Sequence, residues 1–176
     1  MFSNWFRQST LDPLSVSMAG VKLADRVVIV GCGDPRLIAT LAAKAGLTGR
    51  ACAVDDDAGR VREAERVALK EGALIEAFTA PLHSMPFEAG SFDVAVLRDI
   101  MAAADTQAPS VLHEVLRVLR PGGRTLVVES RRRKTAIDGD TLVAALKSVG
   151  FGAVRTLAER DGLLFVEGAN RMLNAE

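Results

Sequence analysis

Two short motifs in the first third of the chain combine residues that suit the binding of a small polar ligand. The β-branched run Arg26–Val30 ends at the turn Gly31-Cys32-Gly33, and a second run, Ala51–Val54, ends at Asp55. Glycine is needed in such a turn where φ is positive or where a Cβ atom would collide with a ligand. Asp55 stands 22 residues after Gly33, and its carboxylate can accept two hydrogen bonds at once, which suits a diol. The alternative is that Asp55 caps the helix that follows it.

Few other side chains are candidates for a catalytic role. Asp99 and His83 are candidates for a general base, although each also fits a helix cap or a loop. Arg98 could hold an acidic acceptor or form a surface ion pair. The run 131–134, Arg-Arg-Arg-Lys, is either an anionic-ligand patch or a solvated charged loop. The catalytic residues are therefore left unassigned.

Cysteine and histidine are scarce. Cys32 and Cys52 are the only cysteines, with His83 and His113 as the only histidines. Because a structural zinc site takes about four such ligands, we predict no metal and two free thiols, which fits a reducing compartment. The N-terminus lacks a basic stretch followed by an apolar one, so we expect a cytoplasmic location. The chain holds no tyrosine, which excludes a phenolic acid or base.

Charge and composition exclude several classes of partner. Lys plus Arg and Asp plus Glu each total 22, and neither half of the chain is polarised, with 10 basic against 11 acidic residues before residue 89 and 12 against 11 after it. We therefore expect no nucleic acid partner. The composition, 49% apolar and 25% charged, is that of a globular protein. No run approaches the ~18 apolar residues of a membrane span.

An alternation of strand-like and helix-like segments positions the two motifs. Continuous apolar runs favour strands covered on both faces, and helical spacing between a capping residue and a glycine favours helices. Strands are predicted at 26–30, 51–54, 74–79, 92–97 and 125–128. Helices are predicted from the cap Asp34 to Gly46, over 58–71, and from Pro109 to Pro121-Gly122-Gly123. This order predicts a parallel sheet with helices on both faces.

The last third ends the sheet differently. Asp140 is predicted to cap a helix that runs to about Val149, and the runs 153–158 and 163–167 flank Asp161-Gly162, a strong hairpin signal. The predicted fold class is α/β: a Rossmann-like, doubly wound, seven-stranded sheet, mostly parallel with a C-terminal antiparallel hairpin. We expect one domain at 21–170, preceded by a segment at 1–20 and followed by a tail at 171–176.

Four landmarks in this order resemble class I S-adenosylmethionine (SAM) dependent methyltransferases. They are the strand, glycine turn and helix of 27–41; Asp55; the stretch from Pro86-Phe87 to Ser91-Phe92-Asp93; and the segment 114–124, Glu-Val-Leu-Arg-Val-Leu-Arg-Pro-Gly-Gly-Arg. The resemblance is greatest to enzymes that act on small molecules and in quinone biosynthesis, and it covers about residues 20 to 168.

This resemblance implies a cofactor, a reaction and a site. The cofactor would be SAM, and the domain would transfer its methyl group to a small or medium organic acceptor. The cofactor-binding residues implied are Gly31, Cys32, Gly33, Asp55, Asp56, Leu82 and Arg98. The acceptor itself is not implied by any residue.

Three departures from the family pattern support an alternative. The family has an acid where this chain has Ile29, a small polar residue and a third glycine where it has Asp34-Pro35, and an acid where it has Pro81. Asp34 would place a negative charge near the carboxylate of SAM. The alternative is a methyltransferase-like domain that has lost SAM and serves as a binding or scaffold module. A Rossmann-like protein that uses another nucleotide is a third reading.

The regions that cover the acceptor in many relatives are short here. An open site would suit a bulky acceptor or a homodimer whose partner completes the walls. Phe2, Trp5 and Phe6 could form an amphipathic cover, pack on the domain, contact a partner or touch a membrane surface.

Overall fold

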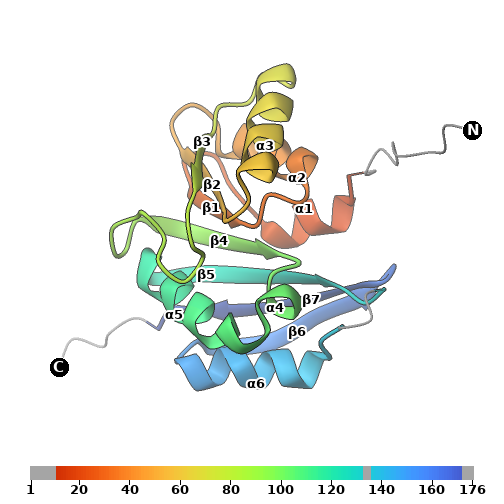
Figure 1. The fold of residues 1–176 in the computed structure, drawn as a ribbon. Helices are drawn as coiled ribbons and strands as arrows, with labels where there is room; N and C mark the ends of the chain where they lie inside the picture. Colours follow the sequence, from red (N-terminus) through yellow and green to blue (C-terminus); the bar gives the residue numbers. More distant parts are fainter. Residues whose placement is uncertain (1–10, 133–135, 172–176) are drawn as a thin grey trace, which may run out of the picture.

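A computed structural model describes residues 11–132 and 136–171 as a seven-stranded sheet between helices (Figure 1). The strand order is β3-β2-β1-β4-β5-β7-β6. The strands are β1 (Arg26–Val30), β2 (Arg50–Asp55), β3 (Glu76–Thr79), β4 (Phe92–Arg98), β5 (Leu119–Ser130), β6 (Gly152–Arg160) and β7 (Leu163–Ala169). Neighbours among β1 to β5 pair in parallel, whereas β7 is antiparallel to both β5 and β6. The predicted fold class and hairpin are confirmed.

The helices divide the core into two layers, one on each face of the sheet. The helices are α1 (Pro13–Ala19), α2 (Pro35–Ala45), α3 (Ala58–Lys70), α4 (Met101–Ala104), α5 (Ala108–Val118) and α6 (Gly139–Val149), with a short 3₁₀ turn η1 (Asp105–Gln107). Buried residues of α1, α2 and α3 pack with Val27 and Ile29 on one face. Those of α5 and α6 pack with Val28 and Val30 on the other. Alternate residues of β1 thus face opposite layers, as the continuous apolar run predicts.

Local capping explains where the long helices begin. Asp34 accepts a hydrogen bond from the Leu37 N–H (3.2 Å), and Pro35 takes the first helical position of α2. Asp57 caps α3 in the same way. The cap of α6 was predicted at Asp140, but Asp138 holds it, and Asp140 lies in the first turn. Both acids suit a helix N-terminus, and a bond from the Thr141 N–H selects the earlier one.

Several segments differ from the sequence prediction. The helix expected to end at Pro121 ends at Val118, and β5 begins at Leu119. Leu119 pairs with Phe92, after which the register shifts, so the Pro-Gly-Gly segment is absorbed as an irregularity of the strand. Strand β3 starts at Glu76 rather than Leu74. Helices α1 and α4 were not predicted, since both are too short for periodicity to reveal them. Among the described residues, no helix is long and apolar enough to cross a membrane.

Candidate functional site

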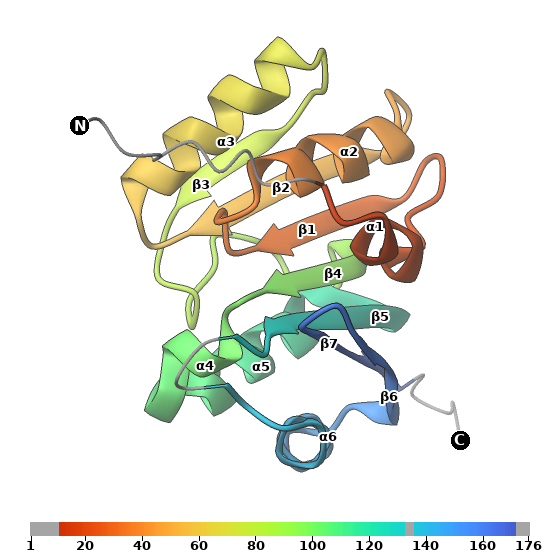
Figure 2. The same cartoon turned by 90° about the vertical axis from the view of Figure 1, so that its right-hand side faces the viewer.

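A cleft lies where the strand order changes direction, between β1 and β4, at the carboxyl ends of the parallel strands. Figure 2 shows β1, β2 and β4 pointing to the same edge, where the loop after β3 and helix α4 also lie. Such a switch point is the usual ligand site of a doubly wound sheet. The cleft has a volume of about 820 Å³. Its lining includes Gly31, Gly33, Asp55, Asp56, Arg60, Pro81, Leu82, His83, Arg98, Asp99 and Ile100.

The two glycines of the turn have different roles. Gly31 has a φ of +98°, and a Cβ there would lie 2.7 Å from Ile100 Cδ1 and 2.8 Å from the Arg98 carbonyl oxygen. Gly31 therefore permits close packing of the turn against the end of β4. A Cβ on Gly33 would meet nothing within 4 Å, so Gly33 keeps the wall of the cleft open.

Asp55 joins the end of β2 to the glycine turn. Its side chain is almost fully buried, and its carboxylate accepts hydrogen bonds from the Cys32 N–H (2.7 Å) and the Asp57 N–H (2.9 Å). Burial raises the pKa of this carboxyl, but the hydrogen bonds from Arg60 and from the two N–H groups outweigh burial and hold the pKa below its ordinary value. Asp55 is thus an ionised acceptor in the cleft.

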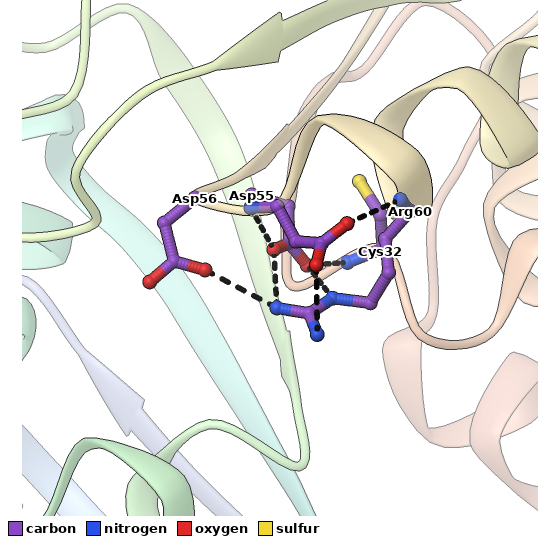
Figure 3. Close-up of polar contacts among 5 residues, drawn as sticks. Cys32, Asp55, Asp56 and Arg60 are labelled. Carbon is purple, nitrogen blue, oxygen red and sulfur yellow. Dashed lines mark hydrogen bonds and ion pairs between the residues drawn. The ribbon is translucent and has the colours of Figure 1, made fainter.

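Arg60, for which the sequence predicts no role, donates hydrogen bonds to the same Asp55 carboxylate. Its Nε donates to Asp55 Oδ2 at 3.0 Å, and its Nη2 donates to Asp55 Oδ1 at 2.7 Å (Figure 3). The Nη2 atom also lies 3.1 Å from Asp56 Oδ1. The sequence predicts Asp55 as a ribose ligand or a helix cap. Its third role, an ion pair, comes from Arg60 in the first turn of α3. An arginine five positions after the acid is the signal that could have revealed it.

Arg98 lies between two acids at the end of β4. Its Nε is 3.9 Å from Asp34 Oδ2, and its Nη1 is 3.0 Å from Asp99 Oδ2. Neither atom has an aligned hydrogen-bond partner among the described residues, although both are buried. The negative charge of Asp34, which the sequence analysis counted against SAM, therefore lies beside a guanidinium.

A network of carboxylates fixes the tip of β4 against β5. Glu129 Oε1 accepts hydrogen bonds from the Ile100 and Met101 N–H groups, both at 2.8 Å. Asp99 Oδ1 accepts one from the Ser130 N–H at 2.7 Å. Burial, with the nearby charge of Asp99, raises the pKa of Glu129 despite these bonds. The sequence gives no sign of this role for Glu129, because its partners lie 27 to 29 residues away, at the start of α4.

The loop after β3 forms the opposite wall. Leu82 is half-buried against the core, whereas Pro81 and His83 are exposed on the cleft side. The Pro81 carbonyl accepts a hydrogen bond from the Ser84 N–H (3.0 Å), so this carbonyl already has a partner. All seven residues predicted for cofactor binding lie in or directly beside the cleft, since Cys32 adjoins it through its N–H bond to Asp55.

Several other candidates have structural surroundings. Burial, with the nearby charge of Asp55, raises the pKa of the Cys32 thiol to about 12, so this thiol is protonated. Arg131 donates to the Glu159 carboxylate (3.0 Å) and to the Ile137 carbonyl. Residues 133–134 and the aromatic residues of the N-terminal segment lie outside the described residues. Within 11–132 and 136–171, no His, Cys, Asp and Glu side chains gather as a metal site would require.

Solved structures share this fold. A SAM-dependent methyltransferase from Aquifex aeolicus superposes with a TM-score of 0.82 at 18% identity, covering 94% of this chain and 93% of that one. The cyclase SpnF superposes with a TM-score of 0.76 at 16% identity, covering 97% and 86%. At these identities the likeness concerns the fold, and the cyclase shows that the fold serves more than one reaction.

Curated relatives match about a third to a half of their own length. A 37.1 kDa protein of a Streptomyces fradiae transposon is 32% identical over 109 residues, which are 62% of this chain and 31% of that protein. The ubiquinone/menaquinone biosynthesis C-methyltransferase of Pseudomonas fluorescens is 27% identical over 129 residues, 70% of this chain and 48% of the enzyme. The family described as "Methyltransferase domain" matches residues 27–123, from β1 through the Pro-Gly-Gly segment. Because this match covers more than half of the chain and spans the whole cleft-forming half of the sheet, the chain belongs to the methyltransferase domain family.

Proposed function

We propose that the cleft binds SAM and that the domain transfers a methyl group to a small or medium organic acceptor. One observation carries the proposal: the glycine turn and Asp55 meet in a single cleft, where the Cys32 N–H joins them at 2.7 Å. A turn that leaves space for a ligand thus adjoins an ionised acceptor suited to a diol.

The residues of the cleft fit the parts of this cofactor. Asp55 would hold the ribose hydroxyls, and the open wall at Gly33 would accommodate the methionine part. Arg98 lines the cleft, and its buried nitrogens without aligned partners among the described residues would suit the cofactor carboxylate. Leu82 and Asp56 would flank the adenine.

The chain's own contribution is to position and to exclude water. When bound, SAM supplies an electrophilic methyl group on a sulfonium, and transfer of that group needs alignment more than a particular side chain. Ile100, Ala104 and Val111 provide an apolar stretch of the lining. His83 and Asp99 also border the cleft and remain the predicted candidates for accepting a proton from the acceptor.

A second function is favoured by one observation. Arg60 donates hydrogen bonds to both oxygens of Asp55. Such an arrangement is expected in a cleft that no longer binds a ribose. In that case the domain would serve as a binding or scaffold module. The open cleft also leaves the predicted homodimer in place as a proposal, which a light-scattering mass of two chains would support and a mass of one chain would refute.

Titration calorimetry with SAM and S-adenosylhomocysteine tests the proposal. We expect binding to the unmodified chain, and a loss of at least about 30-fold in affinity for Asp55→Ala and Asp55→Asn, because two hydrogen bonds to a charged acceptor are removed. The matched control is Asp140→Ala, which removes an exposed acid on α6, far from the cleft. Absence of binding and of thermal stabilisation at millimolar ligand would refute the proposal, since a ligand of the native state must stabilise it.

A further inference from the structure

Each oxygen of the Asp55 carboxylate, which is proposed to bind the ribose, already accepts two hydrogen bonds. Asp55 Oδ2 accepts from the Cys32 N–H and from Arg60 Nε, and Oδ1 accepts from the Asp57 N–H and from Arg60 Nη2. Each carboxylate oxygen accepts about two hydrogen bonds in good geometry. The two backbone donors belong to the fold, whereas the two from Arg60 come from a side chain. Hydroxyl groups can reach Asp55 only where Arg60 gives way.

Arg60 has another carboxylate within reach. Its Nη2 already lies 3.1 Å from Asp56 Oδ1, and its Nη1 lies 3.9 Å from Asp57 Oδ2. The side chain of Arg60 is 50% exposed and that of Asp56 is 65% exposed, so the guanidinium can turn toward solvent without passing through packed atoms. Figure 3 shows the guanidinium in contact with Asp55 and Asp56 together. Leaving Asp55 therefore breaks the ion pair with the buried carboxylate and keeps the one with Asp56.

Resting on the proposed function, we propose that Arg60 sets the affinity for the cofactor: it occupies the place of the ribose hydroxyls on Asp55, and when they bind it leaves Asp55 and stays paired with Asp56 alone. Arg60 is then a competitor built into the site. It touches neither the methyl group nor the acceptor, and its effect is on binding. Asp56 takes the displaced guanidinium and thereby limits the cost of opening.

Moving Arg60 away from Asp55 costs free energy, because a bidentate pair on a buried carboxylate is stronger than a pair between exposed side chains. The apparent dissociation constant is the intrinsic one divided by the fraction of molecules whose Asp55 is free. If that fraction is about a tenth, removal of Arg60 tightens binding about tenfold, which corresponds to about 1.4 kcal/mol.

The experiment compares S-adenosylhomocysteine binding by calorimetry across matched variants. Arg60→Ala and Arg60→Gln should each tighten binding about tenfold. Asp56→Asn should weaken it about threefold, because displaced Arg60 loses its alternative partner. Arg66→Ala is the control, since Arg66 lies on the same helix, carries the same charge and, within the part of the chain that the structure describes, pairs with Glu63. A 2′,3′-dideoxy analogue should lose the gain, because it offers no hydroxyls to Asp55.

A spectroscopic readout follows the side chain itself. In the ¹⁵N-labelled unmodified chain, the Nε–H resonance of Arg60 should shift on titration with S-adenosylhomocysteine, while that of Arg66 stays in place. Unchanged or weaker binding by both Arg60 variants, with binding by the unmodified chain intact, would overturn this inference and leave the proposed function standing. Absence of binding in every variant would overturn both, whereas binding by the unmodified chain that tightens in both Arg60 variants would support both.

Discussion

Asp93 offers a sharp test of the physical reasoning, because it lies away from the cleft. It follows Phe92 at the start of β4, and its carboxylate accepts hydrogen bonds from the Arg26 N–H (2.8 Å), from Arg26 Nε (3.2 Å) and from Arg120 Nε. The side chain of Asp93 is 19% exposed. It therefore ties β1, β4 and the start of β5 together at the amino edge of the sheet.

The size of this stabilisation follows from the shift in the pKa of Asp93. Burial raises the pKa of Asp93, but the hydrogen bonds from Arg26 and Arg120 outweigh it and lower the pKa from 3.8 to about 2. A difference of this size corresponds to about 2.4 kcal/mol of stabilisation at neutral pH. Because both arginines are nearly half exposed, solvent screens the pairs, and we expect Asp93→Asn to cost about 1 to 2 kcal/mol at pH 7.

The pH dependence has a definite sign. Folding lowers the pKa, so the native state binds fewer protons than the unfolded state, and the stabilisation is full above about pH 4. It falls as the pH drops from about 4 through about 2, where both states become protonated. Asp93→Asn has no such titration, so the stability difference between the two proteins should shrink toward zero over this window.

Urea unfolding followed by far-UV circular dichroism measures the effect at several pH values from 7 down to the lowest at which the chain stays folded. Calorimetry with S-adenosylhomocysteine on the same variant should show unchanged affinity, since Asp93 lies at the opposite edge from the cleft. A stability difference that is the same at pH 7 and at about pH 3, or one near zero at pH 7, would refute the assignment of this stabilisation to an ionised Asp93.

Two further predictions concern the glycine turn and the cysteines. Gly31→Ala should destabilise the chain by more than about 2 kcal/mol in urea unfolding, because of its positive φ and contacts below 3 Å. Gly33→Ala should leave stability within about 0.5 kcal/mol and instead weaken S-adenosylhomocysteine binding about tenfold; the opposite pattern would contradict the geometry of the turn. Burial raises the pKa of Cys32 to about 12 and that of Cys52 to about 11, so a disulfide reagent at about pH 8 should label neither thiol until denaturant is added, and rapid labelling of the native chain would contradict this.

Local sequence signals determined most of the sheet and the position of the turn. The apolar run ending at Gly31, the cap at Asp34 and the Asp161-Gly162 hairpin each depend on residues within a few positions of one another. Such signals act between residues that are close in sequence, so at these positions they could be recognised without knowledge of the tertiary contacts. The order of the strands then brought the carboxyl ends of β1 and β4 together, as a doubly wound sheet requires.

Tertiary structure decided which charges that are distant in sequence meet. Arg98 lies beside Asp34, and Glu129 binds the N–H groups after β4, because parallel pairing places strand ends that are distant in sequence at one edge. The same pairing made Leu119 a strand residue where helical periodicity continued past it. The types of residue in the sequence were enough to predict which groups line the cleft. Their charge partners depend on distances of a few ångströms, and these distances are set by strand pairing and helix packing rather than by spacing along the chain.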